Sequence, residues 1–239
     1  MDTAGYVALT RQSGLLREMQ TVANNMANIS TSGFRRENVV FAEMVQAIPA
    51  EGGSVAMAAA RGRYTSDIQG GLEQTNGTFD FAIEGDGFFM VETPDGTRLT
   101  RAGAYTPNID GELVDMNGNR LLDAGEAPIF IPPDASTIAV SSDGTVSADG
   151  QPVAQVAVVN PLDANGLTRE DGVLFKLDGD FEPSPEASVV QGFLEKSNVD
   201  PVIEMTRMIE VQRVYELGQN FMSKEDERIR SAIRTLGGS

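Results

Sequence analysis

A chain of 239 residues, of which 41% are hydrophobic and 22% are charged, can bury a sizeable core and has a globular composition. Its formal charge of −17 disfavours binding to nucleic acid or to an anionic membrane surface, because both would repel it. The absence of histidine and cysteine excludes disulfides, histidine or cysteine zinc sites and histidine-dependent triads. We therefore expect no catalytic residue, no cofactor and no metal site, since an enzyme would depend on carboxylates, Lys, Tyr or Ser alone.

Residues 3 to about 29 are predicted to form a helix. Its seam positions recur at alternating spacings of four and three, as in a coiled coil, and all but Gln12 are apolar: Ala8, Gln12, Leu15, Met19, Val22, Met26 and Ile29. An amphipathic helix packing on its own domain is the alternative. No signal-peptide pattern and no run of 18 apolar residues occurs, so we expect no direct membrane insertion and no cleaved signal peptide.

Three asparagines, Asn24, Asn25 and Asn28, lie near the end of this helix, although Asn costs about 0.7 kcal/mol per residue relative to Ala. They flank the apolar seam, so in a crowded bundle their amides can bond laterally to neighbouring helices. A frayed polar helix end is the alternative. Gly33 then permits positive φ, and Phe34 can anchor the chain where the helix ends.

The middle of the chain is predicted to contain a connector and a β domain. Residues 37–75 have Gly and Pro interruptions and little sustained period, so we expect an extended connector there. Residues 76–196 hold seven Asp-Gly and three Asn-Gly pairs, which favour tight hairpin turns. Short runs such as FDFAI and GFFMVET lie between them and predict a mainly antiparallel domain of many strands.

Three stretches could be taken for binding or functional sites, but a structural role explains each of them better. Asp115 to Glu126 matches several oxygen positions of a calcium loop, but Arg120 stands where that loop needs glycine. GDGFF, from Gly85 to Phe89, lacks the third glycine of a phosphate loop and precedes a strand. KEDER, from Lys224 to Arg228, is typical of a solvated helical face.

Residues 197–239 are predicted to form a second helix that begins between Asn198 and Pro201. Some 35 residues of helix span about 52 Å, which is too long to be covered by a small core. Its seam is predicted at Met205, Met208, Gln212, Tyr215, Gln219, Met222, Asp226, Ile229, Ile233 and Leu236.

Charge follows the same boundaries. Residues 1–36 carry +2 and residues 197–239 carry −1, whereas residues 37–196 carry −18. Nearly neutral helices can pack closely against many copies, while an acidic shell resists unspecific association.

Three blocks resemble one protein family. VANNMANISTSGFRRE, from Val22 to Glu37, resembles the amino-terminal signature of the bacterial flagellar axial proteins of the rod and hook, with Met26 in the usual aliphatic position. The segment from Gly192 to Glu216 is similar to the carboxy-terminal signature of the same family, and residues 85–122 resemble the first hairpins of its β domain. The chain length and single β domain resemble a rod subunit, a proximal-rod member more than a distal-rod one.

The resemblance implies an α+β fold in which residues 1–36 and 197–239 form a coiled-coil-like D0 domain and residues 76–196 form a β-rich D1 domain. It implies a non-enzymatic subunit of the periplasmic rod of the flagellar basal body, exported through the flagellar type III apparatus. Such subunits stack helically with copies of themselves and with other proximal and distal rod proteins, and they transmit torque for motility.

Because the two terminal helices have a seam suited to a polymer but little core of their own, we expect them to be largely disordered before assembly. Their predicted subunit-interface residues are Leu15, Met19, Val22, Asn24, Asn25, Met26, Asn28, Ile29, Gly33, Phe34, Asn198, Met205, Met208, Tyr215, Met222, Ile229 and Ile233. A polysaccharide hydrolase with a carboxylate pair and a scaffold that dimerises through its ends are the alternatives, although nothing singles out two carboxylates.

Overall fold

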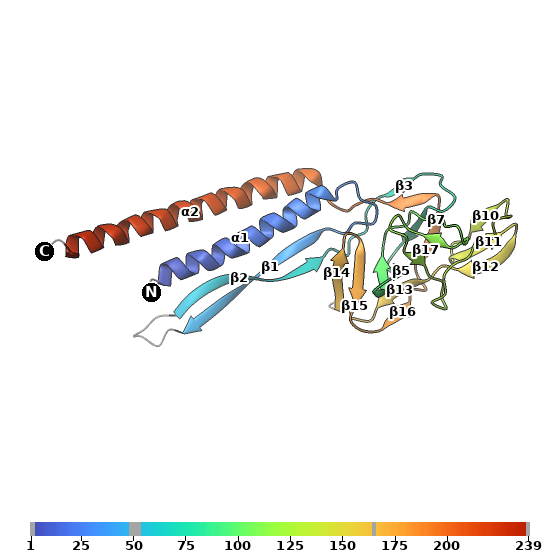
Figure 1. The fold of residues 1–239 in the computed structure, drawn as a ribbon, viewed down its shortest axis with the longest axis horizontal. Helices are drawn as coiled ribbons and strands as arrows, with labels where there is room; N and C mark the ends of the chain where they lie inside the picture. The colour runs from blue at the N-terminus through green and yellow to red at the C-terminus, as the bar shows by residue number, and fades with distance from the viewer. Residues whose placement is uncertain (1–2, 48–53, 164–165, 238–239) are drawn as a thin grey trace. The chain divides into compact units, whose positions relative to one another are not determined.

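The computed structural model in Figure 1 describes residues 3–47, 54–163 and 166–237. Contacts within the chain divide it into two compact units. The helical unit comprises Met1–Ala27, Arg36–Ser66 and Val199–Ser239, and the β unit comprises Asn28–Arg35 and Asp67–Asn198. Two long terminal helices and a set of antiparallel strands confirm the predicted α+β class.

The helical unit contains α1 (Thr3–Ala27), β1 (Glu37–Ala47), β2 (Ser54–Thr65) and α2 (Pro201–Gly237). Helix α2 begins as predicted, because the Asp200 carboxylate accepts hydrogen bonds from the backbone N–H groups of Val202 and Ile203 at 2.8 and 3.1 Å. Proline at the first helical position needs no such partner. No helix in the described part of the chain combines the length and the apolarity that crossing a membrane requires.

Strands β1 and β2 form a long antiparallel hairpin with a bulge between Val40 and Phe41. This hairpin occupies most of residues 37–75, where the sequence predicted an extended connector. Pro49, Gly52 and Gly53 fall between the two strands, outside the described residues, whereas Gly62 lies within β2. Residues 36–66 therefore belong with the helices, and residues 28–35 belong with the β strands.

The β unit is built entirely from antiparallel pairs. Its largest sheet has the order β14-β15-β6-β5-β9-β8-β7, with β13 pairing β5 and β16; β10-β11-β12, β17-β4 and β18-β3 form smaller sheets. The strands are β3 (Leu72–Gln74), β4 (Phe81–Glu84), β5 (Phe88–Thr93), β6 (Gly96–Thr100), β7 (Thr106–Pro107), β8 (Leu113–Val114), β9 (Arg120–Leu121), β10 (Ile138–Val140), β11 (Thr145–Ala148), β12 (Gln151–Gln155), β13 (Val158–Pro161), β14 (Leu167–Asp171), β15 (Leu174–Leu177), β16 (Phe181–Pro183), β17 (Ser188–Gln191) and β18 (Phe193–Glu195).

The predicted Asp-Gly turns join these strands. Asp149 and Gly150 both have positive φ, at 49° and 78°, as a two-residue hairpin between β11 and β12 requires. In the stretch weighed as a calcium loop, the Asp115 carboxylate accepts bonds from the backbone of Asn117 and Asn119 at 2.8 and 2.9 Å. That carboxylate therefore closes a turn. Among the described residues, no group of three acidic side chains is placed to hold a metal ion.

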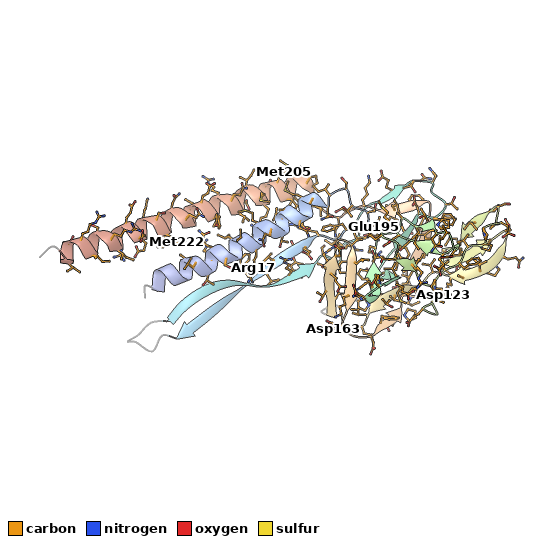
Figure 2. All side chains as sticks on the ribbon, viewed as in Figure 1. Arg17, Asp123, Asp163, Glu195, Met205 and Met222 are labelled. Atoms are coloured by element: carbon orange, nitrogen blue, oxygen red, sulfur yellow. The ribbon has the colours of Figure 1, made fainter. Side chains whose placement is uncertain are left out.

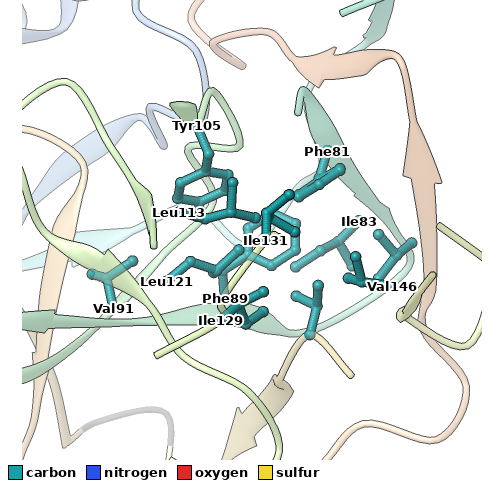
Figure 3. Close-up of a cluster of buried hydrophobic side chains, with 12 residues drawn as sticks. Phe81, Ile83, Phe89, Val91, Tyr105, Leu113, Leu121, Ile129, Ile131 and Val146 are labelled. Carbon is teal, nitrogen blue, oxygen red and sulfur yellow. The ribbon is translucent and has the colours of Figure 1, made fainter. Parts of the chain in front are cut away.

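The β unit buries two clusters of apolar side chains. Figure 3 shows the larger one, which includes Phe81, Phe89 and Leu121. A second cluster surrounds Met90 and Phe175. Among the side chains of the helical unit that the structure describes, those of residues 8–27, 36–41, 62–66 and 199–236, the buried hydrophobic ones are Val22, Val199 and Val211. The β unit thus has an extensive core of its own.

Candidate assembly surface on the terminal helices

Helices α1 and α2 lie side by side and run antiparallel (Figure 1). Apart from Val214, the buried and half-buried side chains of α2 follow the four-three spacing of a coiled-coil seam, at Glu204, Met208, Val211, Tyr215, Gly218, Met222 and Glu225. The predicted seam coincides with this one at Met208, Tyr215 and Met222. Its other positions in this range, Met205, Gln212, Gln219 and Asp226, lie one residue further along and are exposed. A hydrophobicity pattern misses the four observed positions that precede these, because glutamate or glycine occupies three of them, at Glu204, Gly218 and Glu225.

The contact between the two helices includes polar pairs as well as apolar seam residues. The Gln12 amide donates to the Tyr215 carbonyl at 2.9 Å, and Arg207 Nε donates to the Glu18 carboxylate at 2.6 Å. Gly218 provides the space for this contact, since a Cβ there would lie 2.2 Å from the Gln12 amide nitrogen. Polar partners at fixed positions define one alignment of the helices but bury little apolar area.

Asn25 connects three elements of the helical unit and is only 1% exposed. Its Nδ2 donates to the Glu37 carbonyl at 2.8 Å, and its Oδ1 accepts from the Glu37 N–H at 3.0 Å, as a neighbouring strand would. Nδ2 also lies 3.2 Å from Glu204 Oε2, and Arg36 pairs with the other oxygen of Glu204 at 2.6 Å. Asn25 therefore bonds within its own chain, whereas Asn24 is exposed and Asn28 accepts a bond from the Thr31 hydroxyl.

Residues 33–35 are held inside the β unit. Gly33 has the predicted positive φ, at 72°, and a Cβ there would lie 2.3 Å from the backbone of Arg101. The Phe34 ring is fully buried, with the Arg169 guanidinium 4.4 Å from its centre. The Arg35 guanidinium pairs with Glu195 at 3.2 Å. This part of the signature thus anchors the chain to the β strands.

A second arginine completes this buried group. Arg101 also lies 3.2 Å from Glu195, which in addition accepts a bond from the Gly70 N–H at 3.0 Å. Burial lowers the pKa of Arg101 to about 10, with the neighbouring charge of Arg35 acting in the same direction and that of Glu195 opposing it. Asn198 lies close by and donates to the Ile68 carbonyl at 2.7 Å.

The predicted interface residues fall into three classes of exposure. Those buried within the chain are Val22, Asn25, Gly33 and Phe34. Those half-buried are Leu15, Met19, Met26, Asn28, Ile29, Asn198, Met208, Tyr215 and Met222. Those exposed are Asn24, Met205, Ile229 and Ile233.

The helices also expose large apolar side chains that the seam pattern missed. These are Leu9 and Leu16 on α1 and Val202, Ile203, Ile209, Leu217 and Phe221 on α2. At 100° per residue, Ile209 and Leu217 lie on the face of α2 opposite the seam, and Leu9 and Leu16 lie on the face of α1 opposite Glu18. Side chains project from α2 along its length in Figure 2, where Met205 and Met222 are labelled. A two-helix contact covers only one face of each helix, so these residues remain uncovered.

Helix α2 also extends past α1 (Figure 1). Because Gln12 lies beside Gly218 and the helices are antiparallel, the described start of α1 reaches about residue 227 of α2. Ile229, Ile233 and Leu236 continue the apolar stripe beyond that point and are 38%, 63% and 79% exposed. They add an uncovered apolar surface at the end of the helix.

Comparison with known proteins places all three regions in one family. The family model described as Flagella basal body rod protein matches residues 1–35. The model for the Flagellar hook protein FlgE/F/G D1 domain matches residues 82–148, and the model for the Flagellar basal body rod FlgEFG protein C-terminal region matches residues 190–235.

Relatives match over nearly the full length. The flagellar basal-body rod protein FlgF of Caulobacter vibrioides is 40% identical, with 99% of each chain covered. FlgF of Mesorhizobium japonicum is 38% identical, again with 99% of each covered. FlgG of Bacillus subtilis is 30% identical, with 95% of this chain and 97% of that protein covered. The chain therefore belongs to the flagellar basal-body rod protein family, and it is a structural subunit of the rod rather than an enzyme.

Proposed function

We propose that this rod subunit joins copies of itself and other rod proteins through the exposed apolar faces of α1 and α2. The observation that carries the proposal is the exposure of Ile209 and Leu217 opposite the seam, together with Ile229, Ile233 and Leu236 past the end of α1. Apolar residues on several faces of one long helix fit a position among several neighbouring helices. The half-buried seam residues stabilise the contact between α1 and α2 inside the subunit.

The charge distribution supports the same arrangement. The helical unit carries a formal charge of −1, whereas the β unit carries −16. Nearly neutral helical units can approach one another with little repulsion, while the acidic β units repel each other and resist unspecific contact. Growth through the helices is therefore favoured over random association.

The position in the rod is proposed to be proximal, with other rod proteins as neighbours and export through the flagellar type III apparatus. Higher identity to the named FlgF relatives than to the named FlgG relative supports this position. Stacked helical units would transmit torque along the rod across the periplasm. Asn25, Gly33 and Phe34 would serve this role indirectly, because they shape the subunit from inside.

A double substitution in the native host tests the proposal. The gene is deleted and replaced by a variant carrying Ile209→Glu and Leu217→Glu, which places two charges on the face opposite the seam. The matched control carries Gln212→Glu and Gln219→Glu, which adds the same charge at exposed polar positions of α2. We expect the first variant to be non-motile, with basal bodies that lack a complete rod, and the control to swim.

Normal rods in cells with the first variant would overturn the proposal. Circular dichroism of both purified variants checks that helix content equals that of the parent chain. Electron microscopy of basal bodies from the deletion strain shows the stage at which the rod stops. An early stop supports the proximal position, and a stop after most of the rod has formed contradicts it.

A further inference from the structure

We propose that Asn25, Glu37, Glu204 and Arg36 form a register lock, which fixes α1, α2 and the β1–β2 hairpin in a single axial alignment. The lock is a property of one chain and does not depend on assembly, so it can fail while the proposed function stands. Its members come from the end of α1, the start of β1 and the start of α2. The four residues lie close together where these three elements meet.

The four groups form a connected polar network. The Asn25 amide uses both of its polar atoms on the backbone of Glu37, at 2.8 and 3.0 Å, and its Nδ2 also approaches Glu204 at 3.2 Å. Glu204 is 0% exposed and pairs with Arg36 at 2.6 Å. The Glu37 carboxylate is itself 3.9 Å from Arg63 of β2. The buried Glu204 carboxylate has a hydrogen bond from Asn25 and the charge of Arg36 beside it only while these elements are aligned.

The helices need such a device because their apolar contact does not define an alignment. A four-three seam repeats every heptad, so sliding one helix by a heptad brings similar positions together again. Among the described side chains of the unit, the buried hydrophobic ones are Val22, Val199 and Val211. The seam pattern by itself fits the observed alignment and one shifted by a heptad equally.

Sliding by a heptad is blocked by charge. In the observed alignment Glu204 lies beside Asn25, and Arg207 pairs with Glu18. A shift in one direction would bring Glu204 beside Glu18, so that two carboxylates would meet inside the unit. A shift in the other direction would move Glu204 past the end of α1 at Ala27 and bring Glu18 beside Val214, away from Arg207. Either shift would separate a charged group from the partner that it has in the observed alignment.

Two further features select the same alignment. Gly218 leaves room for the Gln12 amide, and any other residue of the seam would carry a Cβ into that space. A polar cavity of about 340 Å³ adjoins the lock and is lined by Glu18, Thr21, Asn25, Arg36, Glu37 and Arg207 among others. In the observed alignment, this cavity gives the charged groups of the lock a polar environment.

The absence of cysteine makes the alignment measurable by disulfide formation in the full-length chain. Gln12→Cys with Gly218→Cys reports the observed alignment, because these residues touch. Gln12→Cys with Val211→Cys or with Glu225→Cys reports a shift by one heptad in either direction. Oxidation is performed on dilute protein, and a non-reducing gel separates cross-links within a chain from those between chains.

Each pair is combined with Asn25→Ala, with Glu204→Gln, or with the control Asn24→Ala, which changes an exposed neighbour of the same type. We expect Asn25→Ala and Glu204→Gln to lower the yield at the observed pair at least several-fold and to raise the yield at a shifted pair. Asn24→Ala should leave both yields unchanged. The helix content is measured in parallel by circular dichroism.

Two outcomes would overturn the proposal. Unchanged yields in Asn25→Ala and Glu204→Gln would show that the network does not set the alignment. Loss of every cross-link together with loss of helix would show that the network holds the helices folded and does not select between alignments. A change in the ratio of shifted to observed product, with helix content retained, is the result that the register lock predicts.

Discussion

Glu195 lies 3.2 Å from Arg35, and both side chains are almost completely buried in the β unit. Arg101 shares the same carboxylate. Glu195→Gln would leave two buried guanidinium groups without their counter-charge. Since breaking a buried pair from one side costs about 3–5 kcal/mol, we expect a loss of that size in the free energy of unfolding. Urea unfolding followed by tyrosine fluorescence measures it, because the chain has no tryptophan.

An exposed pair one residue away provides the control for this substitution. Lys196 and Glu73 lie 3.2 Å apart, but both side chains are more than half exposed. Glu73→Gln removes a charge from the same pair of strands and should cost about 0–1 kcal/mol. Equal losses in the two variants would contradict the assignment of Glu195 as the buried counter-charge.

The pH dependence of stability in alkali should depend on Tyr105. Burial raises the pKa of its hydroxyl well above the ordinary value, and the charge of Asp115 adds to the effect. The folded state keeps this proton where the unfolded chain loses it, so the stabilisation is complete below about pH 10 and is lost as the pH rises further. Tyr105→Phe also removes the bond to the Ala102 carbonyl and should cost about 1 kcal/mol at neutral pH.

Urea unfolding at a series of pH values from about 8 to 11 compares the parent chain with Tyr105→Phe. The free energy of unfolding of the variant should fall less steeply with pH than that of the parent. Arg101 acts in the opposite sense, because its lowered pKa of about 10 makes its contribution grow with rising pH. Arg101 is present in both proteins, so its contribution cancels when their free energies of unfolding are subtracted. Parallel curves for the two proteins would contradict the prediction.

Two turns are closed by the same pattern of hydrogen bonds to an Asp carboxylate. Together they can be used to measure the free-energy cost of a left-handed backbone conformation. Gly118 has φ of 84° in the turn closed by Asp115, and Glu126 has φ of 62° in the turn closed by Asp123. Gly118→Ala should destabilise the chain by about 1 kcal/mol, although a Cβ there meets no atom. Glu126→Gly should stabilise it by about 0.5 kcal/mol, because relief of strain outweighs the added freedom of the unfolded chain.

Thermal or urea unfolding of these two variants gives the sign directly. Both positions lie at exposed hairpin ends, so no core contact changes. Destabilisation by Glu126→Gly would show that the residue makes a contact worth more than its backbone strain.

The helical unit of the free chain should open at a lower free energy than the β unit. The sequence predicts ends that are largely disordered before assembly, and that prediction concerns the free chain in solution. The contact between the helices includes polar pairs at Gln12 and Arg207, whereas β5 contributes to two apolar clusters. Amide hydrogen exchange should therefore be faster in α1 than in β5. Equal protection of the two elements would contradict this account.

The elements with a strong local signal could be predicted from the sequence. The two helices were predicted from a sustained period and from the start signal between Asn198 and Pro201, and the turns of the β unit from pairs such as Asp149-Gly150. These features depend on residues close together in the chain. The sequence likewise predicted the positive φ of Gly33.

The contacts that join distant residues could not be predicted in the same way. A hydrophobic pattern does not recognise Glu204 or Gly218 as interior positions, because their place depends on partners far away in the sequence. For the same reason, Asn25 was predicted to bond to a neighbouring subunit, whereas it bonds to Glu37 and Glu204. The β1–β2 hairpin was missed because its pairing is visible only in the folded chain.

The most direct test of the assembly surface is a photo-cross-link in cells with complete basal bodies. A photoreactive amino acid replaces Leu217 on the face of α2 opposite the seam, and in a control it replaces Met116, which is 95% exposed in the β unit. After irradiation, purified basal bodies are analysed for the protein joined to this chain. The account predicts a covalent adduct between position 217 and a rod protein, either a second copy or another member, at higher yield than from position 116. Complete rods without any adduct from position 217 would contradict it.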